Sequence, residues 1–209
     1  MNSEQDSSTR KLILTMLKTR SSMTVSEMAK ELGITEMAVR RHLNTLERDS
    51  LIESKLVRQA MGRPTHLYSL TLLADDLFPK KYHHLTLDLL GELAEEAGED
   101  VVDGLFERRK KKLISRYGQR MEGKELKQRV AELAEIQNSN GYMVEWEQDG
   151  EGNYVFKEHN CPISQVANQY NHACACELNM FEQLLSADVK RTECLAKGGT
   201  KCIYIIQDK

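Results

Sequence analysis

The first 160 residues of this 209-residue chain contain no cysteine, and all five cysteines lie between residues 161 and 202. No run of 18 apolar residues occurs, so no transmembrane helix and no membrane partner are expected. The polar N-terminus lacks the apolar core of a signal peptide, which predicts a cytoplasmic location. Because thiols stay reduced there, the clustered cysteines indicate metal or redox chemistry rather than a disulfide framework.

Signatures of catalysis are also absent. The sequence has no nucleophile–base set, no phosphate-binding loop and no HExxH, so an enzyme is the least favoured class. Residues 1–72 hold 11 Lys and Arg against 8 Asp and Glu, whereas the remainder holds 18 against 24. A basic module followed by an acidic remainder favours a nucleic-acid-binding domain joined to a second function.

Residues 24–46 have the pattern of a helix-turn-helix. Thr24 and Glu27 form a capping box that should begin one helix, and Gly33 should end it. Thr35 can cap a second helix, and a further helix is predicted before the pair, over residues 10–20. The side chains expected to point inward are Ile13, Met16, Leu17, Val25, Met28, Ala29, Leu32, Val39, Leu43 and Leu46, together with Leu12. A plain αα-hairpin is the alternative.

Two strands are predicted directly after this motif, at residues 51–57 and 66–71. A β-hairpin in this place is a wing, with Gly62, Arg63 and Pro64 at its tip. The second helix of the motif should enter the major groove, where Arg40 or Arg41 can read a guanine and His42 or Arg48 can contact phosphate. Arg63 suits a minor groove. The predicted DNA-contacting residues are Thr35, Glu36, Met37, Arg40, Arg41, His42 and Arg63.

The middle of the chain is predicted to form leucine-rich helices at about 82–97, 100–121 and 123–137. Helices in this position favour a homodimer, which would present two copies of the helix-turn-helix to a palindromic double-stranded DNA operator. The basic run at 108–112 is interpreted as a solvated helix face, with a second nucleic-acid contact as the alternative.

The last third combines predicted strands with a helix. Strands at 142–146 and 153–157 flank an Asp149-Gly150 turn, a helix is expected over 164–185, and a final hairpin should turn at Gly198-Gly199. The sequence therefore predicts an α+β protein. Its expected domains are a winged helix-turn-helix DNA-binding domain (1–78), a helical dimerisation region (79–137) and a cysteine-rich α+β sensor domain (138–209).

The cysteine spacing is Cys161-x12-Cys174-x-Cys176-x17-Cys194-x7-Cys202. No CxxC pair occurs, which disfavours a zinc finger and a thioredoxin-type redox site. Four thiolates from separate elements can enclose a metal ion or an iron–sulfur cluster, and His159 and His172 are potential substitutes. The alternative is that the cysteines are small buried apolar residues.

The stretches MGRPTHLYSLT and LFPKKY near the wing, with HNCPISQVANQY, CACE and KC near the end, resemble the SufR-type iron–sulfur-sensing repressors, a DeoR- or ArsR-like branch. The resemblance covers nearly the whole chain and implies a dimeric DNA-binding repressor whose cluster state sets operator affinity. It implies Cys161, Cys174 and Cys202 as ligands, with Cys194 as the natural fourth and Cys176 as an extra thiol. The spacings of the later cysteines depart from the family pattern.

Two interpretations of the cofactor follow. The first is an iron–sulfur cluster, either [2Fe–2S] or [4Fe–4S], on Cys161, Cys174, Cys194 and Cys202. The second is a winged-helix regulator whose cysteines hold a structural Zn²⁺ or sense thiol oxidation directly.

Overall fold

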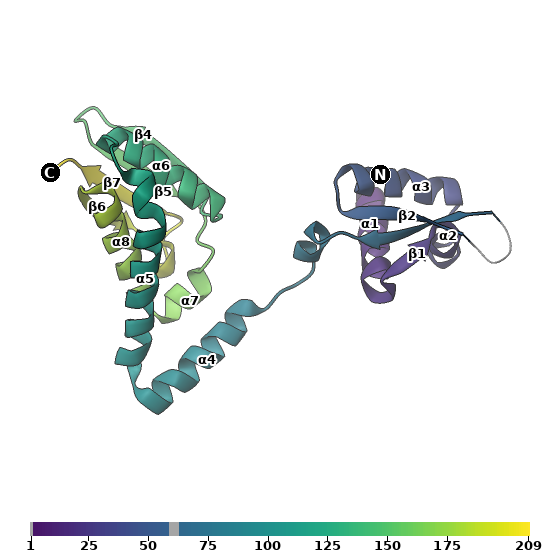
Figure 1. Ribbon diagram of the computed structural model, residues 1–209, viewed down its shortest axis with the longest axis horizontal. Coiled ribbons are helices and arrows are strands. Elements are labelled where there is room, and N and C mark those ends of the chain that lie inside the picture. The colour runs from purple at the N-terminus through teal and green to yellow at the C-terminus, as the bar shows by residue number, and fades with distance from the viewer. Residues whose placement is uncertain (1, 59–62) are drawn as a thin grey trace. The chain divides into compact units, whose positions relative to one another are not determined.

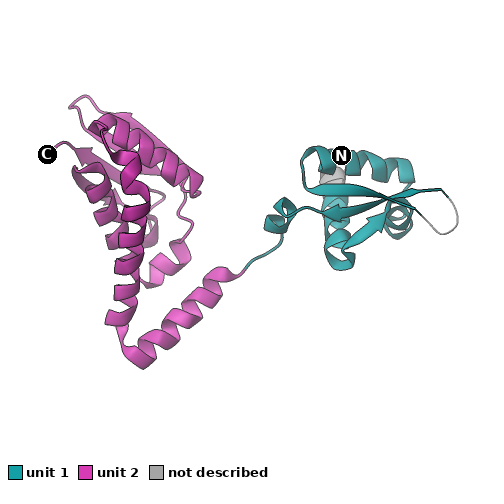
Figure 2. Cartoon of the chain, in the orientation of Figure 1, with its two compact units in different colours: residues 1–80 teal, residues 81–209 magenta. Residues whose placement is uncertain are grey.

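The computed structural model describes residues 2–58 and 63–209, which form two compact units (Figure 2). The N-terminal unit comprises residues 1–80 and the C-terminal unit residues 81–209. Helices and antiparallel strands occur in both, so the predicted α+β class is confirmed. The three predicted domain ranges stay predictions, and the helices of the middle region lie in the same unit as the cysteines.

The N-terminal unit is a winged helix. The capping box is present as predicted: the Glu27 amide donates to Thr24 Oγ1 over 3.3 Å, and the Thr24 amide donates to Glu27 Oε2 over 2.7 Å. Gly33 ends the helix at a φ of 66°, a left-handed conformation that glycine adopts without steric penalty. The elements are α1 (Asn2–Arg20), β1 (Ser22–Thr24), α2 (Val25–Leu32), α3 (Glu36–Arg48), β2 (Ile52–Val57), β3 (Thr65–Leu70) and a 3₁₀ turn (Leu73–Leu77).

The core of this unit is built from the predicted inner faces of its helices. Leu12 is the exception, because its side chain is exposed. A three-residue strand that the sequence did not suggest, β1, pairs antiparallel with β3 and places Met23 opposite Tyr68, giving the sheet order β1-β3-β2. The buried residues are Ile13, Met16, Leu17, Met23, Val25, Met28, Ala29, Val39, Leu43, Leu46, Ile52 and Tyr68.

The C-terminal unit is a four-stranded antiparallel sheet with helices packed on it (Figure 1). Strand order is β4-β5-β7-β6, so the last strand lies between two earlier ones. Buried residues of α6 and α8 share one core with the sheet, and α5 packs against α8. The elements are α4 (Tyr82–Ala97), α5 (Glu99–Met121), α6 (Leu126–Ser139), β4 (Val144–Gln148), β5 (Tyr154–Glu158), α7 (Ser164–Gln169), α8 (His172–Leu185), β6 (Asp188–Glu193), a 3₁₀ turn (Leu195–Lys197) and β7 (Cys202–Gln207).

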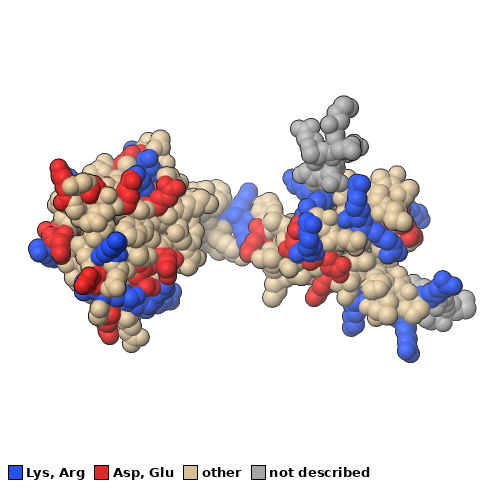
Figure 3. Space-filling view, turned by 90° about the horizontal axis from the view of Figure 1, so that it is seen from above, with Lys and Arg blue, Asp and Glu red and all other residues tan. Residues whose placement is uncertain are grey.

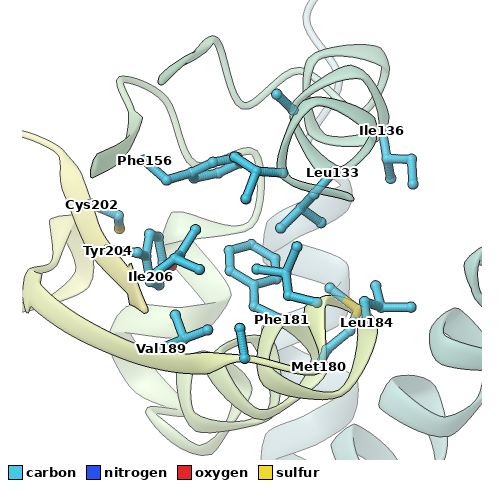
Figure 4. Close-up of a cluster of buried hydrophobic side chains, with 14 of the residues drawn as sticks. Leu133, Ile136, Phe156, Met180, Phe181, Leu184, Val189, Cys202, Tyr204 and Ile206 are labelled. Carbon is cyan, nitrogen blue, oxygen red and sulfur yellow. The ribbon is translucent and has the colours of Figure 1, made fainter. Parts of the chain in front are cut away.

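Aromatic rings fill the space between α8 and the sheet (Figure 4). Phe156 of β5, Phe181 of α8 and Tyr204 of β7 are fully buried, and the Phe181 and Tyr204 ring centroids lie 5.0 Å apart. Burial of each such side chain contributes about 1.5–3 kcal/mol. Alternate residues of β5 and β7 face this core, which places Glu158 and Cys202 on the same buried face, opposite each other across the strands.

The helix predicted over 164–185 is two helices. Tyr170 leaves helical conformation, with a ψ of 81°, and α8 begins two residues later. Asn171 favours such a break, because asparagine is a weak helix former that suits helix ends. The break allows Ala167 of α7 and Cys174 of α8 both to face the core.

The first helix of the C-terminal unit, α4, contributes no buried residue. Tyr82, Leu85 and Leu89, spaced for one helix face, are largely exposed. Among the described residues, no helix is both long enough and apolar enough to cross a bilayer.

Candidate functional site

The exposed face of α3 carries most of the predicted DNA-contacting residues. Thr35 caps the helix by accepting a hydrogen bond from the Ala38 amide over 3.2 Å. Met37 has 77% of its surface exposed, and Arg40 forms an ion pair with Glu36 at 3.7 Å. With Arg41 also exposed, this face offers cations and an apolar side chain at helical spacing.

His42 does not lie on this face. Its exposed fraction is 5%, because it occupies the core side of α3 beside Leu43, and a direct phosphate contact by its ring does not fit this burial. Asn44 is exposed, and it follows Arg40 and Arg41 by one helical turn. Sequence reasoning missed it, although an asparagine at this spacing can pair with an adenine edge.

The wing consists of β2 and β3, paired from Ile52–Leu70 to Val57–Thr65. Arg63 is exposed beside the hairpin end, and Arg58 is exposed at the end of the opposite strand. The predicted tip residue Gly62 lies outside the described residues. On the face shown in Figure 3, Lys and Arg predominate over the N-terminal unit, whereas both signs are intermingled over the C-terminal unit.

Four of the five cysteines converge in the C-terminal unit. Cys161 precedes α7, Cys174 lies in the first turn of α8, Cys194 follows β6, and Cys202 begins β7. After burial, which is the larger cause, the nearby Cys194 thiol also raises the pKa of Cys161, Cys174 and Cys202. Three of the four are buried and Cys161 is partly exposed. We call these four residues the cysteine centre.

The fifth thiol, Cys176, lies apart from this centre. Its pKa is raised to about 11, first by burial and then by Glu107 of α5, to which it donates a hydrogen bond over 3.2 Å. The two histidines considered as substitute ligands are also engaged elsewhere, His159 with Glu145 at 3.3 Å and His172 with Glu107 at 3.2 Å.

A tight turn brings Cys194 next to Cys202. The Cys194 carbonyl accepts hydrogen bonds from the amides of Lys197 and Gly199, each over 3.0 Å. A Cβ at Gly199 would lie 2.8 Å from that carbonyl oxygen, so only glycine fits there. The Leu195 amide points at Cys202 Sγ over 3.4 Å, which supplies a backbone donor to one sulfur.

The surroundings of the cysteine centre were not predictable from the sequence. Burial is the main reason that the pKa of Cys161 rises to about 11 and those of Cys174 and Cys202 to about 12. Arg191 donates a hydrogen bond to the Cys174 carbonyl over 3.0 Å and places a cation beside the thiols. Such a cation stabilises thiolates in a site that burial otherwise keeps neutral.

Two carboxyl groups lie behind the thiols in a hydrogen-bonded network. Glu158 accepts from Gln137 Nε2 over 2.8 Å, and the Tyr204 hydroxyl donates to Glu177 over 3.1 Å. Burial raises the pKa of both carboxyls. The charge of Glu177 further raises the pKa of Glu158, and both carboxyls raise the pKa of Cys202. A protonated carboxyl in this position adds no negative charge next to bound thiolates.

Comparisons with known proteins bear on the N-terminal unit. Residues 7–54 match the family "Bacterial regulatory protein, arsR family". The match includes α2, the turn and α3, which are the elements that carry the exposed cations. The N-terminal unit is thus a helix-turn-helix DNA-binding domain of the kind found in bacterial transcription regulators.

Several solved structures are similar to parts of the chain, with low overall superposition. They include an apo mutant of ZitR from Lactococcus lactis (28% identity, 49% of this chain and 79% of that chain, TM-score 0.30) and the adhesin competence repressor AdcR from Streptococcus pyogenes (22%, 55% and 81%, 0.31). A third is PadR of Bacillus subtilis in complex with operator DNA (13%, 83% and 98%, 0.28). Among curated proteins, none matches the chain.

Proposed function

We propose that this protein is a homodimeric transcriptional repressor whose affinity for a double-stranded DNA operator is controlled by an iron–sulfur cluster. Cys161, Cys174, Cys194 and Cys202 are the cluster ligands. The observation that carries the proposal is the convergence of these four thiols around Cys194 in a chain whose other unit is a DNA-binding domain.

The DNA-binding part of the proposal rests on α3 and the wing. Arg40, Arg41 and Asn44 share the exposed face of α3, where they can reach base edges and phosphates in a major groove. Arg63 extends this surface at the wing, in a position suited to a narrow minor groove.

The dimer part rests on α4. Leu85 and Leu89 expose 56% and 61% of their surfaces, and Tyr82 continues the same stripe. An apolar stripe of this kind on a helix with no buried residue is suited to pairing with the same stripe of a second copy. The apolar residues of α6 already fill the core of their own unit, so α6 is not available for this role.

The ligand set supports a cluster over a single zinc ion. The four thiols come from separate elements, and no two of them form a CxxC pair of the kind that zinc ribbons and fingers use. Four thiolates are the usual ligand set of an iron–sulfur cluster.

The charges also fit. Arg191 offsets part of the negative charge that four thiolates bring, and burial raises the pKa of Glu158 and Glu177, which favours the neutral form of these carboxyls. Cys161 before α7, Cys174 of α8, Cys194 after β6 and Cys202 of β7 would hold the cluster, which would supply a link that depends on iron supply and oxidation state.

The segment after Cys161 connects the cysteine centre to α4. Pro162, Ile163 and Val166 line a cleft of about 550 Å³ together with residues of α4 and α5, and α7 lies in the angle between these two helices (Figure 1). Because α4 directly follows the boundary between the units, a change in the bonding of Cys161 would change the packing of the segment after it against α4, the helix that leads to the DNA-binding domain.

The deciding experiment is purification without oxygen, followed by a visible absorption spectrum with iron and sulfide analysis. We expect a broad absorption band and matching amounts of iron and sulfide. Serine substitution of Cys161, Cys174, Cys194 or Cys202 should abolish loading, whereas Cys176→Ser, the matched control, should retain most of it. A colourless protein with one equivalent of zinc on the cysteine centre would contradict the cluster and favour a structural zinc site. Absence of metal even after reconstitution would favour direct thiol oxidation.

The DNA-reading residues are tested by gel-shift titration. Arg40→Ala and Arg63→Ala should each weaken operator binding about 5-fold or more, since a specific arginine contact contributes about 1–3 kcal/mol. Lys190→Ala, which removes the same charge from an exposed site on β6, is the control. Unchanged operator affinity in both arginine variants contradicts the assignment of this surface.

A further inference from the structure

A second group of ligand-type side chains lies between α5 and α8, outside the cysteine centre. Asp103 and Glu107 are four residues apart on α5, and His172 and Cys176 are four residues apart on α8. Each pair therefore lies on one helix face, and the two faces meet. Side chains on facing helices are a common way to build metal sites in helical folds.

The ligand atoms lie close to the spacing that a single ion requires. Glu107 Oε1 lies 3.2 Å from His172 Nε2 and 3.2 Å from Cys176 Sγ, and the three atoms lie within 4.8 Å of one another. A tetrahedral Zn²⁺ ion with bonds of about 2.0–2.3 Å places its ligands about 3.3–3.8 Å apart. The two distances from Glu107 Oε1 are within a few tenths of an ångström of this spacing, so small side-chain shifts bring the three atoms around one ion.

The surroundings of the three atoms resemble the outer shell of a zinc site. Nδ1 of His172 lies 4.0 Å from Asp103 Oδ2, so a carboxylate faces the ring nitrogen opposite the ligand nitrogen. Carboxylates in this position fix the tautomer and orientation of a metal-bound histidine. Lys110 donates to the other carboxylate oxygen, Glu107 Oε2, over 2.8 Å, which leaves Oε1 for an ion. The positive charge of Lys110 acts against the binding of a cation.

The three side chains are accessible to an ion, and one of them carries a negative charge. His172 and Glu107 are about one-third exposed, whereas Cys176 is buried beneath them, so an ion can enter from solvent onto a sheltered thiol. The pKa of Glu107 is lowered to about 2, first by the Lys110 hydrogen bond and then by Cys176, so this ligand is an anion. A mixed sulfur, nitrogen and oxygen set suits Zn²⁺ and its substitute Co²⁺.

We propose that Glu107, His172 and Cys176 form a second metal site, for a single divalent ion of the zinc class, with Asp103 orienting the histidine and a fourth position open to solvent. The ion fastens α5 to the first turn of α8, which also carries Cys174 of the cysteine centre. The site requires no cluster, so the proposal stands apart from the proposed function.

The test uses the full-length protein, reduced and freed of metal by a chelator, titrated with Co²⁺ and then with Zn²⁺ as competitor. We expect one four-coordinate Co²⁺ with a thiolate-to-metal absorption band that persists in the Cys161→Ser/Cys202→Ser variant. Cys176→Ser should remove this band, and Glu107→Gln should weaken Co²⁺ binding more than 100-fold. Asp103→Asn should weaken it about 10- to 100-fold, because the carboxylate that orients His172 is lost. Glu99→Gln, on the same helix, is the control.

Glu107→Gln keeps the test decisive if Cys176→Ser does not fold, because Glu107 is partly exposed and its loss removes no core atoms. Circular dichroism melting curves establish folding for each variant. Two results overturn the proposal: Co²⁺ affinity unchanged in both Cys176→Ser and Glu107→Gln, or a thiolate band that disappears only when Cys161 and Cys202 are replaced. Iron loading of Cys176→Ser, measured separately, reports on the cluster alone.

Discussion

The two units differ in what their cores contain. The core of the N-terminal unit is hydrocarbon and methionine, with His42 as the buried polar side chain among the described residues. The core of the C-terminal unit also encloses Gln137, Glu158 and three buried thiols. Buried polar groups destabilise a fold unless each finds a partner, and here each described one does.

This difference corresponds to two tasks. A DNA-binding domain must keep one conformation, and a close-packed apolar core with capped helices maintains that conformation without a bound cofactor. A domain that responds to a metal or an oxidant must hold reactive atoms inside, and its stability then depends on what is bound and on pH. The predictions below test this contrast.

The largest effect is expected from Leu43→Ala in the N-terminal core. Leu43 is fully buried, so its truncation should lower the free energy of unfolding of this unit by about 2–5 kcal/mol. Calorimetry should show one transition moved to lower temperature while the transition of the C-terminal unit stays in place. Leu12→Ala, at the exposed leucine of the same unit, should change stability by less than about 0.5 kcal/mol. A common shift of both transitions would contradict independent cores.

An intermediate effect is expected from Glu158→Gln in the C-terminal core. Burial, followed by the charge of Glu177, raises the pKa of Glu158 well above the ordinary 4.5. The folded metal-free protein therefore binds this proton more tightly than the unfolded chain does, and stability falls as pH rises from about 4.5 toward the raised pKa. The slope is at most about 1.4 kcal/mol per pH unit.

Glutamine has no proton to lose, so the melting temperature of Glu158→Gln should decrease less with pH than that of the unchanged protein. Thermal melts of the metal-free protein at several pH values measure this. Glu145→Gln, at an exposed position on β4, serves as the control and should keep the original slope. Identical slopes in all three proteins would exclude Glu158 as the group responsible.

The smallest effect is expected from Thr24→Ala at the start of α2. This change removes the side-chain oxygen that accepts from the Glu27 amide, and loss of such a cap costs about 1 kcal/mol. Chemical denaturation followed by helix content should show this loss in the N-terminal unit. Thr15→Ala, whose hydroxyl bonds a carbonyl inside α1, should be neutral or slightly stabilising, and equal losses at both positions would argue against the capping box.

The N-terminal unit was largely predictable because its signals are local. The capping box at Thr24, the left-handed turn at Gly33 and the apolar periodicity of α3 lie within 25 residues of one another. The sequence missed β1, because three residues form a strand only when they pair with β3 far along the chain. It also misplaced His42, since a polar side chain beside an apolar position gives no sign of being buried.

The sequence predicts which cysteines act as ligands, and this assignment stays a prediction, whereas the environment of the thiols had no signal in the sequence. The cysteines are few and lie in one stretch of the sequence, and their spacing together with a family resemblance already distinguished Cys176 from the other four. Arg191 and Glu158 had no such signal, because strand pairing and burial bring them to the thiols. The group around Glu107 was equally hidden, since its members on α5 and α8 are 65 and 69 residues apart.

The position of β7 inside the sheet has a consequence for the order of events during synthesis. β7 lies between β5 and β6, and it supplies Cys202. Domains fold as units while the chain leaves the ribosome, N-terminal parts first. The DNA-binding domain can therefore fold, and bind DNA, before residues 202–207 emerge to complete the sheet of the C-terminal unit.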